Sequence, residues 1–135
     1  MAGGARIHHF GQVVRDIDAH LAGSLWQTVG PIVTDPLQRA RLCLAALPGD
    51  APLVELIQPL DADSPTWNAL QRGPGWHHVC LMLPTRAAGD TFVQERRLLP
   101  ITEWMPAVLF AGRPIRFVYS RQRELIELLA DERSR

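Results

Sequence analysis

Two pairs of adjacent histidines stand at matching places in this chain. One pair, His8–His9, lies near its start, and the other, His77–His78, follows 69 residues later. Each pair has a glutamate downstream inside an apolar run, Glu55 after the first and Glu127 after the second. Imidazole nitrogens and carboxylate oxygens are ligands that divalent metal ions accept, so these residues are candidates for a metal site.

The repetition indicates an internal duplication, with one module at about 5–60 and a second at about 76–130. Two copies related by a pseudo-twofold axis bring equivalent positions together, which would supply two nitrogen and two oxygen ligands. Side chains alternate between the two faces of a strand, so only one histidine of each pair can face such a site. Periodicity alone does not say which one.

The glutamates strengthen the metal interpretation. A carboxylate inside an apolar strand costs several kcal/mol if it is buried without a partner, so burial of Glu55 or Glu127 would demand a cation. The alternative is that each glutamate lies on a solvated face of a sheet. A solvated position is less expected here, because a glutamate strand matched with a histidine strand occurs in both modules.

The elements that must position these residues follow the same order twice. Apolar spacing and turn signals predict, in the first module, a strand at 7–14, a helix capped by Asp16 that carries Ile17, Leu21 and Leu25, and strands near 32–33, 40–47 and 53–60. The second module repeats this with a strand at 76–83, a helix capped by Thr85, and strands near 107–110, 114–119 and 124–129. Ser64-Pro65 predicts a short helix between the modules.

Composition narrows the class of protein. The chain has 135 residues, which fits a single domain over 1–135, and its 14 basic residues balance 14 acidic ones. No net field attracts nucleic acid or an anionic membrane. The first residues lack the charged start and apolar core that are typical of a signal peptide, and no apolar run approaches about 20 residues. Cys43 and Cys80 lie in apolar runs. We therefore expect a soluble, cytoplasmic protein without disulfides.

Other residues allow weaker hypotheses. Trp67 and Trp76 either pack against the core or line a substrate pocket. Arg96-Arg97 and the 121–123 stretch either form solvated faces or bind a phosphate or carboxylate of a substrate. The sequence has no glycine-rich phosphate loop, no Gly-x-Ser-x-Gly elbow and no Cys-x-x-Cys pair, so nucleophilic hydrolysis and dithiol chemistry have no support.

Several motifs together carry a family resemblance. The chain resembles the vicinal oxygen chelate superfamily of glyoxalases, bleomycin resistance proteins and dioxygenases, and within it the methylmalonyl-CoA epimerases. The resemblance rests on Ile7–Ile17, Val54–Leu60, Asp63-Ser64-Pro65, Gly75–Val79 and Leu125–Leu128.

This resemblance implies an α+β fold of two βαβββ modules, whose mixed sheet curls around an open cleft with one divalent metal. His9, Glu55, His78 and Glu127 fall on the family's ligand positions. The resemblance implies that the metal chelates two substrate oxygens and stabilises an enolate. Nitrogen and oxygen ligands are compatible with Zn, Ni, Co, Mn or Fe. Glu127 is then also a catalytic residue.

The sequence departs from the epimerase pattern at the catalytic base. The family's carboxylate base aligns with Gln38, which cannot accept a proton from carbon, and Glu103 is the alternative base in the second module. The resemblance therefore predicts a metal-dependent epimerase-like isomerase for a small oxoacid or acyl thioester, and a homodimer. A glyoxalase-type lyase, a metal-dependent oxygenase and a non-catalytic metabolite- or antibiotic-binding protein are the alternatives.

Overall fold

The computed structural model describes residues 4–49 and 52–132. Contacts divide the chain into two units, one formed by residues 9–77 and the other by residues 1–8 together with 78–135. Strand β1 (Arg6–Val13) and strand β6 (Gly75–Leu83) each contribute residues to both units.

The unit of residues 9–77 contains most of the first module. After β1 come α1 (Ile17–Ala22), β2 (Gln27–Thr28), β3 (Val33–Asp35), β4 (Ala40–Ala46), β5 (Leu53–Pro59) and α2 (Trp67–Gln71). The strand order is β2-β4-β5-β1, with β3 also paired to β4. Strands β1 and β5 are parallel, whereas β4 and β5 are antiparallel, so the sheet is mixed.

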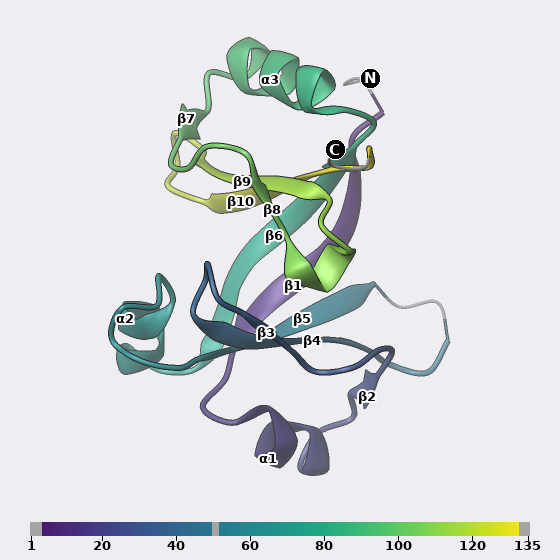
Figure 1. Ribbon diagram of the computed structural model, residues 1–135, viewed down its shortest axis with the longest axis vertical. Helices are drawn as coiled ribbons and strands as arrows, with labels where there is room; N and C mark the ends of the chain where they lie inside the picture. Colours follow the sequence, from purple (N-terminus) through teal and green to yellow (C-terminus); the bar gives the residue numbers. More distant parts are fainter. Residues whose placement is uncertain (1–3, 50–51, 133–135) are drawn as a thin grey trace. The chain divides into compact units, whose positions relative to one another are not determined.

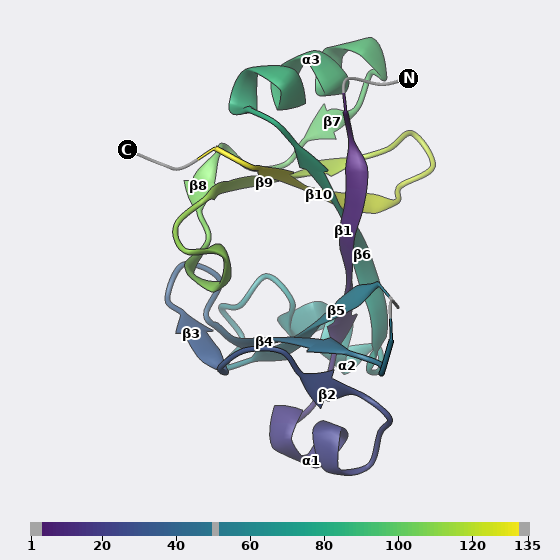
Figure 2. The same cartoon turned by 90° about the vertical axis from the view of Figure 1, so that its right-hand side faces the viewer.

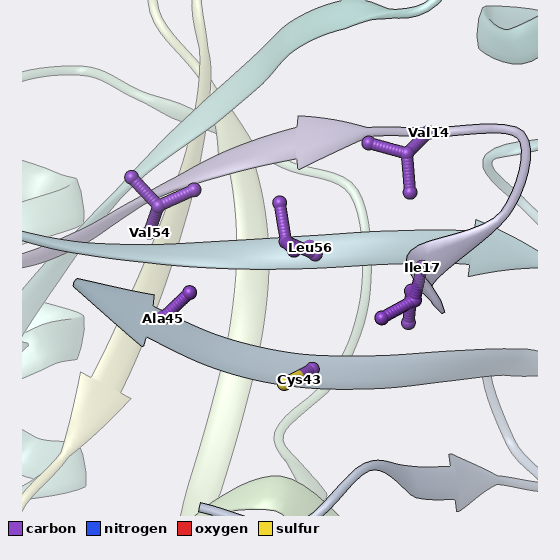
Figure 3. Packing of buried hydrophobic residues seen from close by; sticks show 6 residues of the cluster. All are labelled: Val14, Ile17, Cys43, Ala45, Val54 and Leu56. Atoms are coloured by element: carbon purple, nitrogen blue, oxygen red, sulfur yellow. The ribbon is translucent and has the colours of Figure 1, made fainter. Parts of the chain in front are cut away.

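Helix α1 begins where the sequence predicts. The Asp16 side chain accepts a hydrogen bond from the backbone N–H of Ala19 at 2.9 Å, which caps the helix. Ile17 is fully buried and packs with residues of β4 and β5, as Figure 3 shows for Cys43 and Leu56. The helix is shorter than predicted, because it ends at Ala22 before Gly23, and Leu25 is 80% exposed instead of lying on its apolar face.

The other unit contains most of the second module. It holds the remainder of β6, then α3 (Arg86–Glu95), β7 (Leu99–Pro100), β8 (Met105–Pro106), the 3-10 helix η1 (Val108–Phe110), β9 (Pro114–Tyr119) and β10 (Leu125–Ala130). The strand order is β6-β10-β9-β7, and β8 also pairs with β9. Helix α3 lies over β9 and β10 in both Figure 1 and Figure 2. Phe92 and Val93 of this helix belong to a buried cluster with Val118 and Leu128 of the two strands.

The predicted strand at 107–110 is wrong. Val108–Phe110 forms a 3-10 helix instead, and the turn that follows is closed by a hydrogen bond from the Gly112 N–H to the Ala107 carbonyl oxygen at 2.9 Å. Ala111 adopts a left-handed conformation with φ of 57°, which a strand cannot contain. The extended segment lies two residues earlier, as β8.

The same order of elements nevertheless occurs twice. In each module a long strand and a helix are followed by two short strands that pair with the same long neighbour, β2 and β3 with β4, and β7 and β8 with β9. Counting each short pair as one interrupted strand gives βαβββ twice. The predicted mixed α+β fold class is confirmed. No helix built from residues 4–49 and 52–132 is long and apolar enough to cross a membrane.

Candidate functional site

The first histidine–glutamate pair lies in the unit of residues 9–77. Parallel pairing of β1 and β5 places Gly11 opposite Glu55, so Glu55 shares a face with Gly11 and with His9, two residues earlier. His9 Nε2 lies 3.2 Å from Glu55 Oε1. His9 is fully buried and Glu55 is 3% exposed, so both polar groups are removed from solvent.

The second pair repeats this geometry in the other unit. Parallel pairing of β6 and β10 places Cys80 opposite Glu127, and Cys80 lies two residues after His78. His78 Nε2 lies 3.2 Å from Glu127 Oε1, and Glu127 is 1% exposed. The two modules thus share one rule: the glutamate pairs with the residue two positions after the histidine. This identical register is what an internal duplication predicts.

The structure also decides which histidine of each adjacent pair meets the glutamate. It is the second one, His9 in β1 and His78 in β6. The preceding His8 points to the other face and makes an edge contact with Phe110, with ring centroids 5.2 Å apart. Phe117, opposite Glu127 in the β9–β10 pairing, makes a similar edge contact with the His78 ring at 5.7 Å. That contact helps to fix the orientation of the imidazole.

Each pair by itself offers two groups that a metal ion accepts as ligands. A buried carboxylate requires a positive partner, which is either a protonated imidazole or a metal ion held by both groups. A neutral imidazole nitrogen and a carboxylate oxygen from adjacent strands form a ligand set suited to Zn, Ni, Co, Mn or Fe, and less so to a purely oxygen-loving ion such as Mg²⁺. The residues present are therefore compatible with a divalent metal.

Gln38, at the family's base position, belongs to a hydrogen-bonded turn after β3. Its side-chain Nε2 donates to Asp35 Oδ2 at 3.2 Å, and its carbonyl oxygen accepts from Ser64 Oγ at 2.9 Å. Ser64 is 4% exposed and also shares a hydrogen bond with Thr66. The Asp-Ser-Pro motif therefore has a structural role, because it fixes the backbone of Gln38.

Sequence reasoning missed Asp35. This residue is 1% exposed and its Oδ1 accepts from the backbone N–H groups of Leu37 and Gln38 at 2.9 and 3.3 Å. The pairing of β3 with β4 and of β4 with β5 puts Asp35 on the same sheet face as Glu55. An aspartate just before Pro36 is a common start of such a turn, and that signal was available in the sequence.

The remaining predicted site residues lie on the periphery of their units. Glu103 is exposed in the connection between β7 and β8. Trp67 begins α2 and is half-buried. Trp76 lies in β6, is 66% exposed and makes an edge contact with Phe10 at 6.4 Å between ring centroids. None of these positions by itself tests the predicted catalytic or substrate-binding roles.

Comparison with known proteins gives a consistent picture. Residues 8–95 match the family described as the glyoxalase/bleomycin resistance protein/dioxygenase superfamily. No curated protein sequence matches the chain. A hypothetical protein from Bacillus halodurans has a similar structure, with 24% identity, a TM-score of 0.81, and coverage of 98% of each chain.

Two further solved structures are methylmalonyl-CoA epimerases. The Mycobacterium tuberculosis enzyme is 24% identical with a TM-score of 0.79, over 93% of this chain and 87% of that one. A Streptomyces coelicolor variant in complex with 2-nitronate-propionyl-CoA is 21% identical with a TM-score of 0.75, over 93% and 96%. At these identities the similarity establishes the fold alone.

Proposed function

Because the chain belongs to the glyoxalase/bleomycin resistance protein/dioxygenase superfamily, we propose that it is a metal-dependent isomerase of the epimerase type. Its substrate is a small oxoacid or an acyl thioester that forms an enolate. The single observation that supports this most is the pair of buried histidine–glutamate contacts in equivalent registers. Similar structures that hold acyl-CoA ligands add support for the thioester class.

We assign His9, Glu55, His78 and Glu127 as ligands of one divalent ion. All four side chains carry metal-ligating atoms and all four are buried. When bound, the ion supplies Lewis acidity that stabilises negative charge on substrate oxygens. The protein contributes fixed ligands, since each imidazole and carboxylate is attached to a strand of a hydrogen-bonded sheet.

The proton transfer requires a base other than Gln38. Asp35 is a poor candidate, because three hydrogen bonds already occupy its oxygens, from Leu37 N, Gln38 N and Gln38 Nε2. Glu103 is the base in our proposal, because it is an exposed carboxylate at the corresponding place in the second module. The Gln38 side chain can still donate a hydrogen bond to a substrate, or stabilise the turn after β3 through its contact with Asp35.

Metal stoichiometry tests the ligand assignment. We expect the purified protein to bind one divalent ion per chain, and either Glu55→Gln or Glu127→Gln to remove nearly all of it. Removal of one charged ligand from a site with four ligands weakens the metal affinity of the whole site, so much less than half of the metal should remain bound. The matched control Glu124→Gln changes an exposed glutamate near the β9–β10 turn and should leave the metal content unchanged. Retention of half the metal in each single variant would show two separate sites and overturn the assignment.

Proton exchange tests the reaction class. The metal-loaded protein should exchange the α-proton of an acyl thioester with deuterated solvent, as measured by NMR, and Glu103→Gln should slow the exchange by about 10²-fold or more. Gln38→Glu restores a carboxylate at the family's base position and should accelerate exchange. Absence of exchange with both acyl thioesters and free oxoacids would reject the isomerase proposal.

One observation favours a second candidate. Gln38 stands where the family has a carboxylate base, and its amide cannot accept the proton. The lack of a base at this position is expected of a protein that binds a metabolite without converting it. Such a protein would bind its ligand in the presence of metal but would not exchange the α-proton of the ligand. The Gln38→Glu variant would not exchange it either.

A further inference from the structure

A histidine and a cysteine outside the assigned metal ligands lie together in the unit of residues 1–8 and 78–135. A ring nitrogen of His8 in β1 and the Sγ atom of Cys80 in β6 are within 4.8 Å of each other. Cys80 is a free cysteine and is fully buried, and His8 is half-buried. We call these two residues the thiol–imidazole pair.

The separation of the two ligand atoms suits a single metal ion between them. Bonds from a metal ion to cysteine sulfur and to histidine nitrogen are about 2.3 and 2.0 Å long. Two such ligands on opposite sides of one ion are therefore about 4.3 Å apart. The limit of 4.8 Å between the atoms of the pair accommodates this distance. Soft monovalent ions, Cu(I) above all, accept a linear arrangement of two ligands and prefer thiolate sulfur.

Burial restricts the charge of an ion at the pair. A thiolate and a neutral imidazole together carry one negative charge, which a monovalent ion cancels and a divalent ion exceeds. Glu127 lies opposite Cys80 in the pairing of β6 with β10, but its carboxylate is 3.2 Å from His78 and is assigned to the first ion. An excess of charge in a buried site is costly, so the pair favours a monovalent ion over a divalent one.

The surroundings of the pair combine an aromatic cover with a small opening. The Phe110 ring lies edge-on to the His8 ring, with centroids 5.2 Å apart. The opening has a volume of about 170 Å³, and Arg6 and Met82 are among its lining residues. Arg6 shares a face of β1 with His8, and Met82 shares a face of β6 with Cys80, so the opening adjoins the pair along both strands. The Met82 thioether is also a soft sulfur ligand and favours the same class of ion.

We propose that His8 and Cys80 form a second metal site, which binds one Cu(I) ion in a nearly linear arrangement. Cys80 supplies a thiolate sulfur and His8 supplies a neutral ring nitrogen. Binding replaces the thiol proton by the ion, releases that proton to solvent and transfers no electron. The first site differs in kind, because its nitrogen and oxygen ligands suit divalent ions. This inference does not depend on the proposed isomerase function.

Competition with the Cu(I) chelator bathocuproine disulfonate, in anaerobic buffer with a reductant, tests the proposal on the full chain. The wild-type protein should bind one Cu(I) ion per chain. Cys80→Ala and His8→Asn should each weaken binding at least about 100-fold, since even the outer partners of metal ligands contribute about 10–100-fold. X-ray absorption at the copper edge should show one sulfur and one nitrogen neighbour in the wild type, and His8→Asn should lose the imidazole signal.

Cys43→Ala is the matched control, because Cys43 is also a free and fully buried cysteine but lies in the other unit. This variant should change Cu(I) affinity by less than about twofold. Equal loss in Cys43→Ala, unchanged binding by Cys80→Ala, or no Cu(I) binding by the wild-type protein would overturn the proposal. An equal loss in His78→Asn and His8→Asn would also refute it, because the nitrogen ligand would then not be specific to His8.

The two metal sites can be tested separately. Glu55→Gln should remove the divalent ion and leave Cu(I) affinity unchanged, since Glu55 belongs to the other unit. Cys80→Ala should lose Cu(I) binding and keep its divalent ion. Loss of both ions in Cys80→Ala would assign the sulfur to the first site and refute a second one. A protein that binds Cu(I) through the pair but exchanges no α-proton would retain the second site and lose the isomerase proposal.

Discussion

Gly89 provides a sharp test of packing in the second unit. It lies inside helix α3 and is buried. A Cβ atom at this position would lie 2.8 Å from Cζ2 and Cη2 of Trp104, where ordinary contacts begin at 3.4 Å. The indole ring therefore has to move before an alanine fits.

The ring is held in place from two sides. Trp104 Nε1 donates to Asp90 Oδ1 at 2.9 Å, and the Arg116 guanidinium lies 5.7 Å from the ring centroid. Arg116 itself donates to the same Asp90 oxygen at 3.2 Å and to the Thr102 carbonyl oxygen at 3.1 Å. Moving the indole disturbs all of these contacts together, so the ring cannot move away at low cost.

Two effects of opposite sign determine the outcome for Gly89→Ala. Alanine favours a helix over glycine by about 1 kcal/mol. Overpacking of a held ring costs about 1–3 kcal/mol. We expect a net loss of about 1 kcal/mol in the free energy of unfolding, which corresponds to a fall in Tm of about 4 °C for a chain of this size.

Urea unfolding followed by circular dichroism measures this difference. In a Trp104→Leu background the clash is gone, so Gly89→Ala should become stabilising by about 1 kcal/mol. A rise in stability from Gly89→Ala in the wild-type background would refute the reasoning. So would the same change in both backgrounds, because the effect would then not involve the indole.

Three other predictions follow from named contacts. Ser64→Ala removes the hydroxyl that donates to the Gln38 carbonyl oxygen, and should lower the unfolding free energy by about 1–3 kcal/mol in urea titrations; a loss below about 0.3 kcal/mol would contradict it. Burial raises the pKa of the Cys43 thiol, so Ellman's reagent should label it only upon unfolding, and rapid labelling of the native protein would disprove its burial. A side-chain hydrogen bond from Arg39 lowers the pKa of Asp61, so the stabilisation is present above the unfolded pKa of about 3.9 and is lost as pH falls through the folded value. The Tm difference between wild type and Asp61→Asn should therefore shrink below about pH 4, and a constant difference would exclude that linkage.

The sequence alone predicted the repeated modules and the fold class. Periodicity located the long strands and the capped starts of α1 and α3, because alternating burial and N-caps are local properties. Local signals failed at 107–110, where the left-handed Ala111 closes a turn that apolar composition does not reveal. The homodimer and the single metal per chain stay predictions.

Only the tertiary structure decided which groups meet. Alternation along β1 and β6 could not choose between neighbouring histidines, and only the family resemblance named His9 and His78. Pairing with β5 and β10 places these two beside the glutamates. The contact of Ser64 with Gln38 joins residues 26 positions apart. Residue types and spacing set which chemistry is available, but contacts between distant strands depend on register, which is a property of the assembled sheet.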